Sequence, residues 1–366
     1  MTHKAGRYPI AVDTDGQDLF AIQLKDHKGQ VCIKAAFHEP LNKKPANSED
    51  VPAPAMSHDT AHPELSGTLK RLKKTKGFSG RRIILHLPME KMLSFPVNFK
   101  LKKDDNQDWA LLAEIEKSLP YALEDAVADY PSIYQSGTAD QKTAIITAAK
   151  KKDVLDLIAP YKKAGFLVEA VDFSPLSLVR IHGFLAQSHE KPDVICHIGR
   201  SQSSLIVVGQ NRIYALNKFN WGRNKLKDRL DRTLKYDRAA PHALDLLKTY
   251  GLEEVTDTRE NTKISGIISR ILTPPMEELI FEFHKVLGYA LAKEQFHSIG
   301  NIYFYGLGAT VKGLNRYIEQ RLNIPATLGT IKNHITWEAP LQTPDMETWA
   351  LFSPAIGLAA RRIPWR

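Results

Sequence analysis

The stretch that decides the fold is DVICHIGRSQSSLIVV, residues 193–208. Two apolar, β-branched segments flank a polar turn centred on Gly199, a pattern that predicts a β-hairpin. Residues 10–24, IAVDTDGQDLFAIQL, repeat this arrangement around a turn at Gly16. A strand, turn and strand unit that occurs once in each half predicts a duplicated α/β fold with a cleft between two lobes.

The rest of the chain offers strands and helices that fit such a duplication. The segment 39–63 is rich in proline, alanine, serine and charge, and we expect a mobile loop there. The order β-α-β-β-α-β over residues 89–173 predicts a small α+β subdomain inserted in the first lobe. Apolar periodicity predicts strands at 31–37, 82–87, 89–99, 128–134, 142–149, 166–172, 211–221 and 301–305, and helices at 108–120, 151–164, 224–248, 276–299, 312–322 and 353–360.

Composition narrows the class of protein. The chain has 366 residues, 43% of them hydrophobic, and a net charge of +9, so it can bury a large core. No apolar run is long enough to span a bilayer and the first residues lack a signal-peptide core, so we expect a cytoplasmic protein. Cys32 and Cys196 lie in apolar strand patterns and should be buried thiols. The basic cluster at 70–82 holds a single aromatic residue, Phe78, too few to stack a run of bases, which argues against nucleic-acid binding, and the histidines lack metal-site spacing.

The segment EIEKSLPYALED, residues 114–125, followed by Asp129 and Tyr130, resembles the inserted subdomain of PilM proteins of type IV pilus assembly. This family belongs to the actin-like ATPase fold and is related to FtsA. Weaker similarities are Leu87-Pro88 after a strand, FNWGRNKL at 219–226, and the small-residue helix at 354–360. The resemblance implies an actin-like (ribonuclease H-like) two-lobed α/β fold. Its expected parts are a first lobe at 1–96, an inserted partner-binding subdomain at 97–172, a return at 173–192, a second lobe at 193–345, and a C-terminal helix and tail at 346–366 that pack on the first lobe.

The resemblance also implies where a nucleotide would bind, and the sequence departs from the family there. Asp15 replaces a glycine, Asp18 a serine and Phe20 a lysine of the first phosphate loop, and each carboxylate near a phosphate costs about 1 to 4 kcal/mol. His197 replaces the aspartate of the second loop, where we expect a partly buried, hydrogen-bonded imidazole, and Leu307 separates two glycines of the adenosine loop. We therefore expect weak or no binding of ATP and Mg²⁺ and no catalytic residue. The implied positions are Asp13, Gly16, Gln17, Gly199, Ser201, Gln202, Asn224, Gly306 and Gly308.

The implied partner is the short cytoplasmic N-terminal peptide of a PilN-like inner-membrane protein. The resemblance makes the chain a scaffold, peripheral to the inner membrane, with a peptide groove near 87–95 and 119–129. The tail RRIPWR, residues 361–366, resembles the ligand itself, so self-association through Ile363, Pro364 and Trp365 is a further hypothesis. The expected groove residues are Leu87, Pro88, Leu93, Leu119, Tyr121 and Leu123.

Three alternatives stay open on the sequence. One is an active ATPase or sugar kinase of the same fold. Another is a haloacid dehalogenase-type phosphatase with Asp13 as nucleophile and Asp15 as general acid. That chemistry needs a second acidic pair after an apolar strand, whereas the pair Asp104-Asp105 lies in a polar run. The third is the cytoplasmic part of a secretion-system L subunit, which would continue into a transmembrane helix beyond Arg366.

Overall fold

The computed structural model describes residues 8–27, 30–41, 63–100, 106–135, 140–185, 191–210, 212–234, 242–253, 258–294, 296–329, 335–338 and 345–362. Most of the loop expected at 39–63 and the tail residues Ile363, Pro364 and Trp365 lie outside this part of the chain. Strand β3 includes Pro40, and helix α1 begins at Pro63. Within the described residues, no helix has both the length and the apolar character needed to cross a membrane.

Two large sheets repeat one topology, as the two similar sequence units predict. The first has the order β14-β3-β2-β1-β4-β8, and the second has the order β11-β10-β9-β12-β13. In each, the hairpin strands are antiparallel and the next central strand is parallel to the first one. The strands of the first sheet are β1 (Ile10–Thr14), β2 (Asp18–His27), β3 (Gln30–Pro40), β4 (Arg82–Leu87), β8 (Leu167–Phe173) and β14 (Thr336–Trp337); those of the second are β9 (Asp193–Ile198), β10 (Ser203–Gly209), β11 (Arg212–Phe219), β12 (Ile302–Tyr305) and β13 (Ala326–Leu328).

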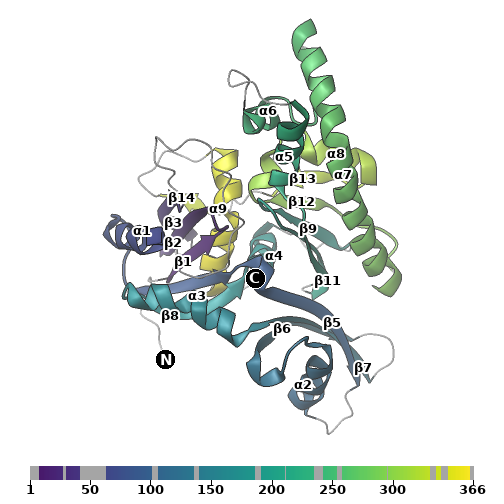
Figure 1. Ribbon diagram of the computed structural model, residues 1–366. Coiled ribbons are helices and arrows are strands. Elements are labelled where there is room, and N and C mark those ends of the chain that lie inside the picture. Colours follow the sequence, from purple (N-terminus) through teal and green to yellow (C-terminus); the bar gives the residue numbers. More distant parts are fainter. Residues whose placement is uncertain are drawn as a thin grey trace.

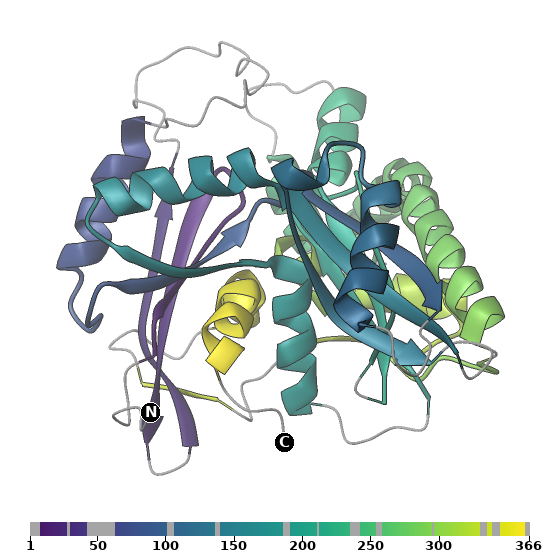
Figure 2. The same ribbon diagram turned by 90° about the horizontal axis from the view of Figure 1, so that it is seen from below.

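The helices cover both faces of both sheets (Figure 1). Helices α1 and α3 cover one face of the first sheet, α4 and α9 lie between the two sheets, and α5 to α8 cover the far face of the second. Figure 2 shows α9 and α4 beside the strands of the first sheet, with α7 on the opposite side of the molecule. The helices are α1 (Pro63–Lys74), α2 (Gln107–Ser118), α3 (Lys151–Lys163), α4 (Ser174–Leu185), α5 (Arg223–Leu234), α6 (Ala243–Thr249), α7 (Arg259–Glu294), α8 (Leu314–Leu322) and α9 (Met346–Ala359), with short 3₁₀ turns η1 (Met89–Lys91), η2 (Leu123–Asp125), η3 (Leu307–Thr310) and η4 (Ala360–Arg362).

The alternation of side chains along the strands explains this layering. In β1, Ile10 and Val12 face the α1 and α3 side, while Ala11 faces α4 and α9. In β9, Val194, Cys196 and Ile198 face α5 to α8, and Ile195 faces the central helices. Because successive residues of a strand point to opposite faces, a continuous apolar run requires cover on both sides. Cys32 and Cys196 are buried and free, as expected.

A separate three-stranded sheet has the order β5-β7-β6, with β5 (Met92–Lys100), β6 (Ala126–Gln135) and β7 (Gln141–Lys150), and packs against α2. In Figure 1 it lies below the two large sheets. The structure differs here from the expected β-α-β-β-α-β unit, because β8 pairs with β4 of the first large sheet and α3 packs on that sheet. The compact inserted unit therefore runs from Met92 to Lys150.

Three helix predictions were wrong in extent. The helix expected at 353–360 begins at Met346. The helix expected at 276–299 begins at Arg259 and continues through Pro274 and Pro275. Proline in a helix interior removes a backbone hydrogen bond, which made a start after this pair the expected choice. Burial of Leu272, Met276 and Leu279 in the core of the second sheet offsets that loss. The helix expected at 224–248 consists of the two helices α5 and α6, with residues 235–241 between them outside the described chain.

Candidate functional site

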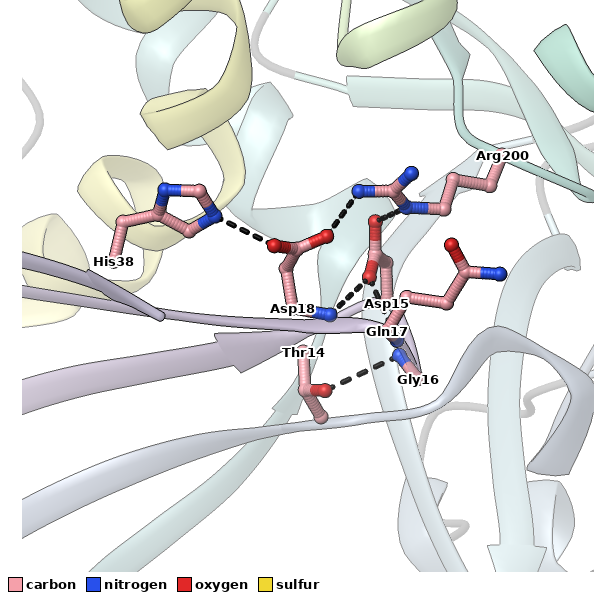
Figure 3. Close-up of polar contacts among 7 residues, drawn as sticks. All are labelled: Thr14, Asp15, Gly16, Gln17, Asp18, His38 and Arg200. Carbon is pink, nitrogen blue, oxygen red and sulfur yellow. Dashed lines mark hydrogen bonds and ion pairs between the residues drawn. The ribbon is translucent and has the colours of Figure 1, made fainter. Parts of the chain in front are cut away.

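In the turn between β1 and β2, backbone N–H groups donate hydrogen bonds to side chains of the same turn. The N–H groups of Gln17 and Asp18 donate to Oδ1 of Asp15 at 3.1 and 2.9 Å, and the Gly16 N–H donates to Oγ1 of Thr14 at 3.2 Å (Figure 3). Gly16 has φ +83°, a left-handed conformation that favours glycine. Backbone N–H groups in such a turn could bind a phosphate. Here the carboxylate of Asp15 already accepts from two of them.

Arg200 connects this turn to the other large sheet. It lies in the β9–β10 turn, and its guanidinium donates through Nε to Asp15 and through a terminal nitrogen to Asp18 (Figure 3). On its other side, Oδ1 of Asp18 lies 2.7 Å from Nε2 of His38. The hydrogen bond from His38, followed by the charge of Arg200, holds the pKa of Asp18 below its ordinary value of 3.8. We call Asp15, Asp18, His38 and Arg200 the cleft clamp.

The second turn is closed by backbone contacts. The Gly199 N–H donates to the Gln202 carbonyl at 3.0 Å, and the Asn224 N–H donates to the Arg200 carbonyl at 2.8 Å. The side chain of Gln202 donates to Oδ1 of Asn220 at 3.1 Å, while Ser201 is exposed. The structure thus brings these sequence-predicted positions into the same turn region as Arg200, where Oε1 of Gln202 is buried without a partner among the described residues.

The two glycines of the expected adenosine loop, Gly306 and Gly308, allow that loop to pack closely against β9. A Cβ on Gly308 would lie 2.1 Å from Cγ2 of Ile198, and one on Gly306, which has φ +85°, would lie 2.5 Å from the His197 ring. The loop therefore packs directly on the end of β9. Burial lowers the pKa of His197 to about 4; the charge of Asp13 raises this pKa and that of His86 lowers it, each with a smaller effect. The expectation of a hydrogen-bonded imidazole differs from the structure in one respect, because Nδ1 of His197 is buried without a partner among the described residues.

The side chains of Asp13 and Phe20 contact residues inside the protein. Oδ1 of Asp13 lies 2.8 Å from Nδ1 of His86, whose Nε2 lies 2.6 Å from Oγ of Ser177 in α4. Phe20, at the position of the family lysine, stacks on His38 at a centroid distance of 4.6 Å and meets Phe352 of α9 edge-on. Its ring belongs to the core between the large sheets, which sequence reasoning on the loop alone missed.

These residues do not fit a magnesium-bound triphosphate. Two carboxylates stand in the first turn, and the turn N–H groups already donate to one of them. Phe20 stands where the family has a lysine, so that cation is missing at this position. Among the described residues, no group of three histidine, cysteine or acidic side chains is placed to hold a metal ion. The haloacid dehalogenase chemistry also lacks support, since Asp13 is paired with His86 and Asp15 with Arg200.

A cavity of about 940 Å³ opens where the three sheets meet. One wall is the face of the three-stranded sheet that carries Val127, Asp129, Thr147 and Ala149, opposite the face that packs on α2. Another wall comes from the first large sheet and the helix after it, with Leu87, Phe173, Leu176 and Arg180. The β10–β11 hairpin of the second large sheet completes it with Val208 and Ile213. Neither the size nor the position of this cavity was evident from sequence, because its walls come from distant segments.

Two pairs of ionisable side chains border the apolar walls of this cavity. Asp172 lies 2.7 Å from a terminal nitrogen of Arg180 and 3.7 Å from Nε of Arg361, and Oδ2 of Asp193 lies 3.3 Å from Nε2 of His182. Val127 is 46% exposed although it is a β-branched apolar residue on a sheet face. An exposed apolar surface with polar side chains at its border is typical of a binding groove for another molecule.

The six residues expected to form the groove are only partly brought together. Leu87 lines the cavity, at the junction with the three-stranded sheet. Leu93, Leu119 and Leu123 instead pack against the core between that sheet and α2. Tyr121 is half-buried, with Nζ of Lys150 at 5.5 Å from its ring centroid. Pro88 follows Leu87 at the end of β4 but is absent from the lining. Residues 127–129 of the expected groove region contribute to a wall.

The fold and the matching family agree. A family model described as type IV pilus assembly protein PilM matches residues 11–363. The chain belongs to the PilM family. The solved structure of a PilM-PilN type IV pilus biogenesis complex contains a chain that is 16% identical and superposes with a TM-score of 0.73, over 98% of this PilM-family chain and 99% of that one.

The similarity extends to other actin-like proteins. MreB5 of Spiroplasma citri, solved with bound AMPPNP, is 12% identical and superposes with a TM-score of 0.51, over 90% of this chain and 92% of that one. At such identities the likeness shows the fold alone. The protein is therefore a PilM-like type IV pilus assembly protein with the actin-like α/β fold.

Proposed function

We propose that this PilM-family protein is a scaffold that binds a short cytoplasmic peptide of a PilN-like inner-membrane protein in the cavity between the three sheets. The observation that carries this proposal is the cavity itself, whose walls present Val127, Leu87 and Val208 to a common space. A cavity of about 940 Å³ has the size of a site for several side chains of an extended segment. The partner would hold the scaffold at the inner membrane.

The name of the similar solved complex supports the choice of partner, since it pairs a PilM protein with a PilN protein. The chemistry of the walls supports the choice of ligand. Apolar side chains on a sheet face favour an apolar peptide, and the side-chain pairs of Asp172 with Arg180 and Asp193 with His182 offer polar contacts at the border.

Isothermal titration with a synthetic N-terminal peptide of the PilN-like protein from the same organism tests this function. We expect saturable binding to the wild type and at least a tenfold loss, about 1.4 kcal/mol, for Val127→Arg, because the new charge occupies the apolar wall. The matched control is Leu155→Arg, which alters a similarly exposed apolar residue on α3 that does not line the cavity. Equal binding to both variants and the wild type would contradict the proposal.

We further propose that this scaffold works without ATP. The engaged N–H groups of the first turn and the paired carboxylates of Asp15 and Asp18 support this view. Titration with Mg²⁺ and ATP should show no binding tighter than millimolar. A dissociation constant near 1 μM, about −8 kcal/mol, would instead favour the alternative of an active ATPase. The double variant Asp15→Gly, Asp18→Ser should bind ATP and Mg²⁺ more tightly than the wild type.

The hypothesis of self-association through the tail is a second proposal. Arg361, the last but one of the described residues, lines the cavity and lies 3.7 Å from Asp172. A chain that continues from this point carries Ile363, Pro364 and Trp365, which are apolar enough to compete with the peptide. Deletion of residues 363–366 should tighten peptide binding or reduce the oligomeric state in a sedimentation run. No change in either quantity would remove the tail from the function.

A further inference from the structure

We infer that the cleft clamp takes the structural place of a bound nucleotide, holding the two large sheets together and thereby setting the shape of the cavity. This inference extends the proposed function, because its readout includes peptide binding in that cavity. Within the clamp, Arg200 of the β9–β10 turn spans two carboxylates of the β1–β2 turn, 182 and 185 residues away along the chain.

The chemistry of the clamp suits this role. A guanidinium is planar and binds two carboxylates through separate N–H groups, and it stays protonated. The side chains of Arg200 and Asp18 are only 17% and 11% exposed, so solvent screens their attraction less than it would at the surface. The Asp15 carboxylate accepts from the turn N–H groups on one side and from Arg200 on the other, so it satisfies the backbone donors that a phosphate would otherwise bind.

The cavity depends on how the two large sheets are placed. Leu87 and Phe173 of the first sheet and Val208 and Ile213 of the second line the same space, so a rotation of one sheet against the other changes its width. Further contacts also link the second sheet to the region of the inserted unit. Nζ of Lys218 in β11 donates to the Met89 carbonyl at 2.8 Å, so a movement of the second sheet would also displace the start of β5.

A hydrogen-bonded chain leads from the cleft to the cavity through the first sheet and α4. Asp13 at the end of β1 contacts His86, which contacts Ser177, and Oγ of Ser177 lies 3.3 Å from Arg180. Arg180 in turn pairs with Asp172 at the cavity wall. The β1–β2 turn that the clamp holds is therefore physically connected to the cavity on the first-sheet side, in addition to the shared walls.

The test compares Arg200→Met with Lys225→Met in the full chain. Lys225 forms an ion pair with Glu278 at the surface, and both residues lie in the second half of the chain. Loss of Lys225 therefore removes a charge without breaking the contact between the two large sheets. For Arg200→Met we expect a larger radius of gyration in small-angle X-ray scattering and at least a tenfold weaker affinity for the PilN-like peptide. For Lys225→Met both quantities should equal those of the wild type, and Mg²⁺ with ATP should change neither in the wild type.

A second variant covers the case in which Arg200→Met fails to fold. Asp15→Asn keeps the oxygen that accepts from the turn N–H groups but removes one charge of the clamp, and it should show a smaller change in the same direction. The inference is overturned if a folded Arg200→Met or Asp15→Asn protein keeps both the radius and the peptide affinity of the wild type. The proposed function fails separately, if the wild type does not bind the peptide or Val127→Arg binds it equally well.

Discussion

Nδ1 of His86 lies 2.8 Å from Oδ1 of Asp13, and Nε2 of the same ring lies 2.6 Å from Oγ of Ser177. The order of these three groups resembles an acid, a base and a hydroxyl nucleophile. Ser177 is fully buried, however, and His86 is 3% exposed, so no substrate reaches the hydroxyl. The arrangement joins β1, β4 and α4 rather than forming a reactive centre.

We predict that Ser177→Ala lowers the free energy of unfolding by about 1–3 kcal/mol, because it leaves a buried nitrogen of His86 without its partner. Urea denaturation measures this loss. Ser118→Ala is the matched control, since the Ser118 hydroxyl bonds to the Glu114 carbonyl on the exposed end of α2, and it should cost less than about 0.5 kcal/mol. Stoichiometric labelling of the wild type by a fluorophosphonate would contradict the structural role of Ser177.

The packing of α9 on α4 predicts a large effect at Gly357. A Cβ there would lie 2.1 Å from the Ser177 carbonyl oxygen, so Gly357→Ala should destabilise the protein by about 1–3 kcal/mol or more. Gly288→Ala in α7 is the control, because its Cβ would meet nothing within 4 Å. There we expect a gain of about 0.5–1 kcal/mol from helix propensity. Thermal unfolding of both variants compares them, and similar melting temperatures would show that α9 can move away from α4.

The lowered pKa of His197 predicts that the protein loses stability in mild acid. Its pKa is about 4 in the folded protein and 6.5 ordinarily, so the unfolded chain takes up a proton first as the pH falls. The free energy of unfolding should therefore fall by about 3 kcal/mol between pH 6.5 and pH 4 from this residue. His197→Gln should remove most of this slope in denaturant titrations across that range. The same change at the exposed His242 should leave the slope as it is.

Asp18 predicts a separate dependence at lower pH. Its pKa lies below 3.8, first because of the hydrogen bond from His38, so its stabilising effect is complete above pH 3.8 and is lost as the pH falls through the folded-state pKa. Asp18→Asn should cost about 2–3 kcal/mol at pH 7, as expected for a hydrogen-bonded charge. The difference from the wild type should shrink below pH 3.8. Glu278→Gln, at an exposed pair, should cost at most about 0.5 kcal/mol at every pH. A constant difference down to pH 2 would contradict the ionic role of Asp18.

The sequence by itself determined the duplicated fold. Apolar runs around the turns at Gly16 and Gly199 predict two hairpins, and both hairpins exist, each at the centre of a sheet with the same strand order. Local patterns decide such elements, since a two-sided apolar strand or an amphipathic helix is encoded within about ten residues. The substitutions Asp15 and Asp18 were likewise visible as departures from a phosphate loop.

Only the tertiary structure decided what those departures do. Arg200 was a turn residue without an assigned role, and its pairing with Asp15 and Asp18 depends on the approach of two segments more than 180 residues apart. The inward position of Phe20, the wall formed by Val127 with Val208, and the passage of α7 through Pro274 have the same origin. Each depends on packing between distant elements, and packing energy overrides local preference wherever enough apolar surface is buried.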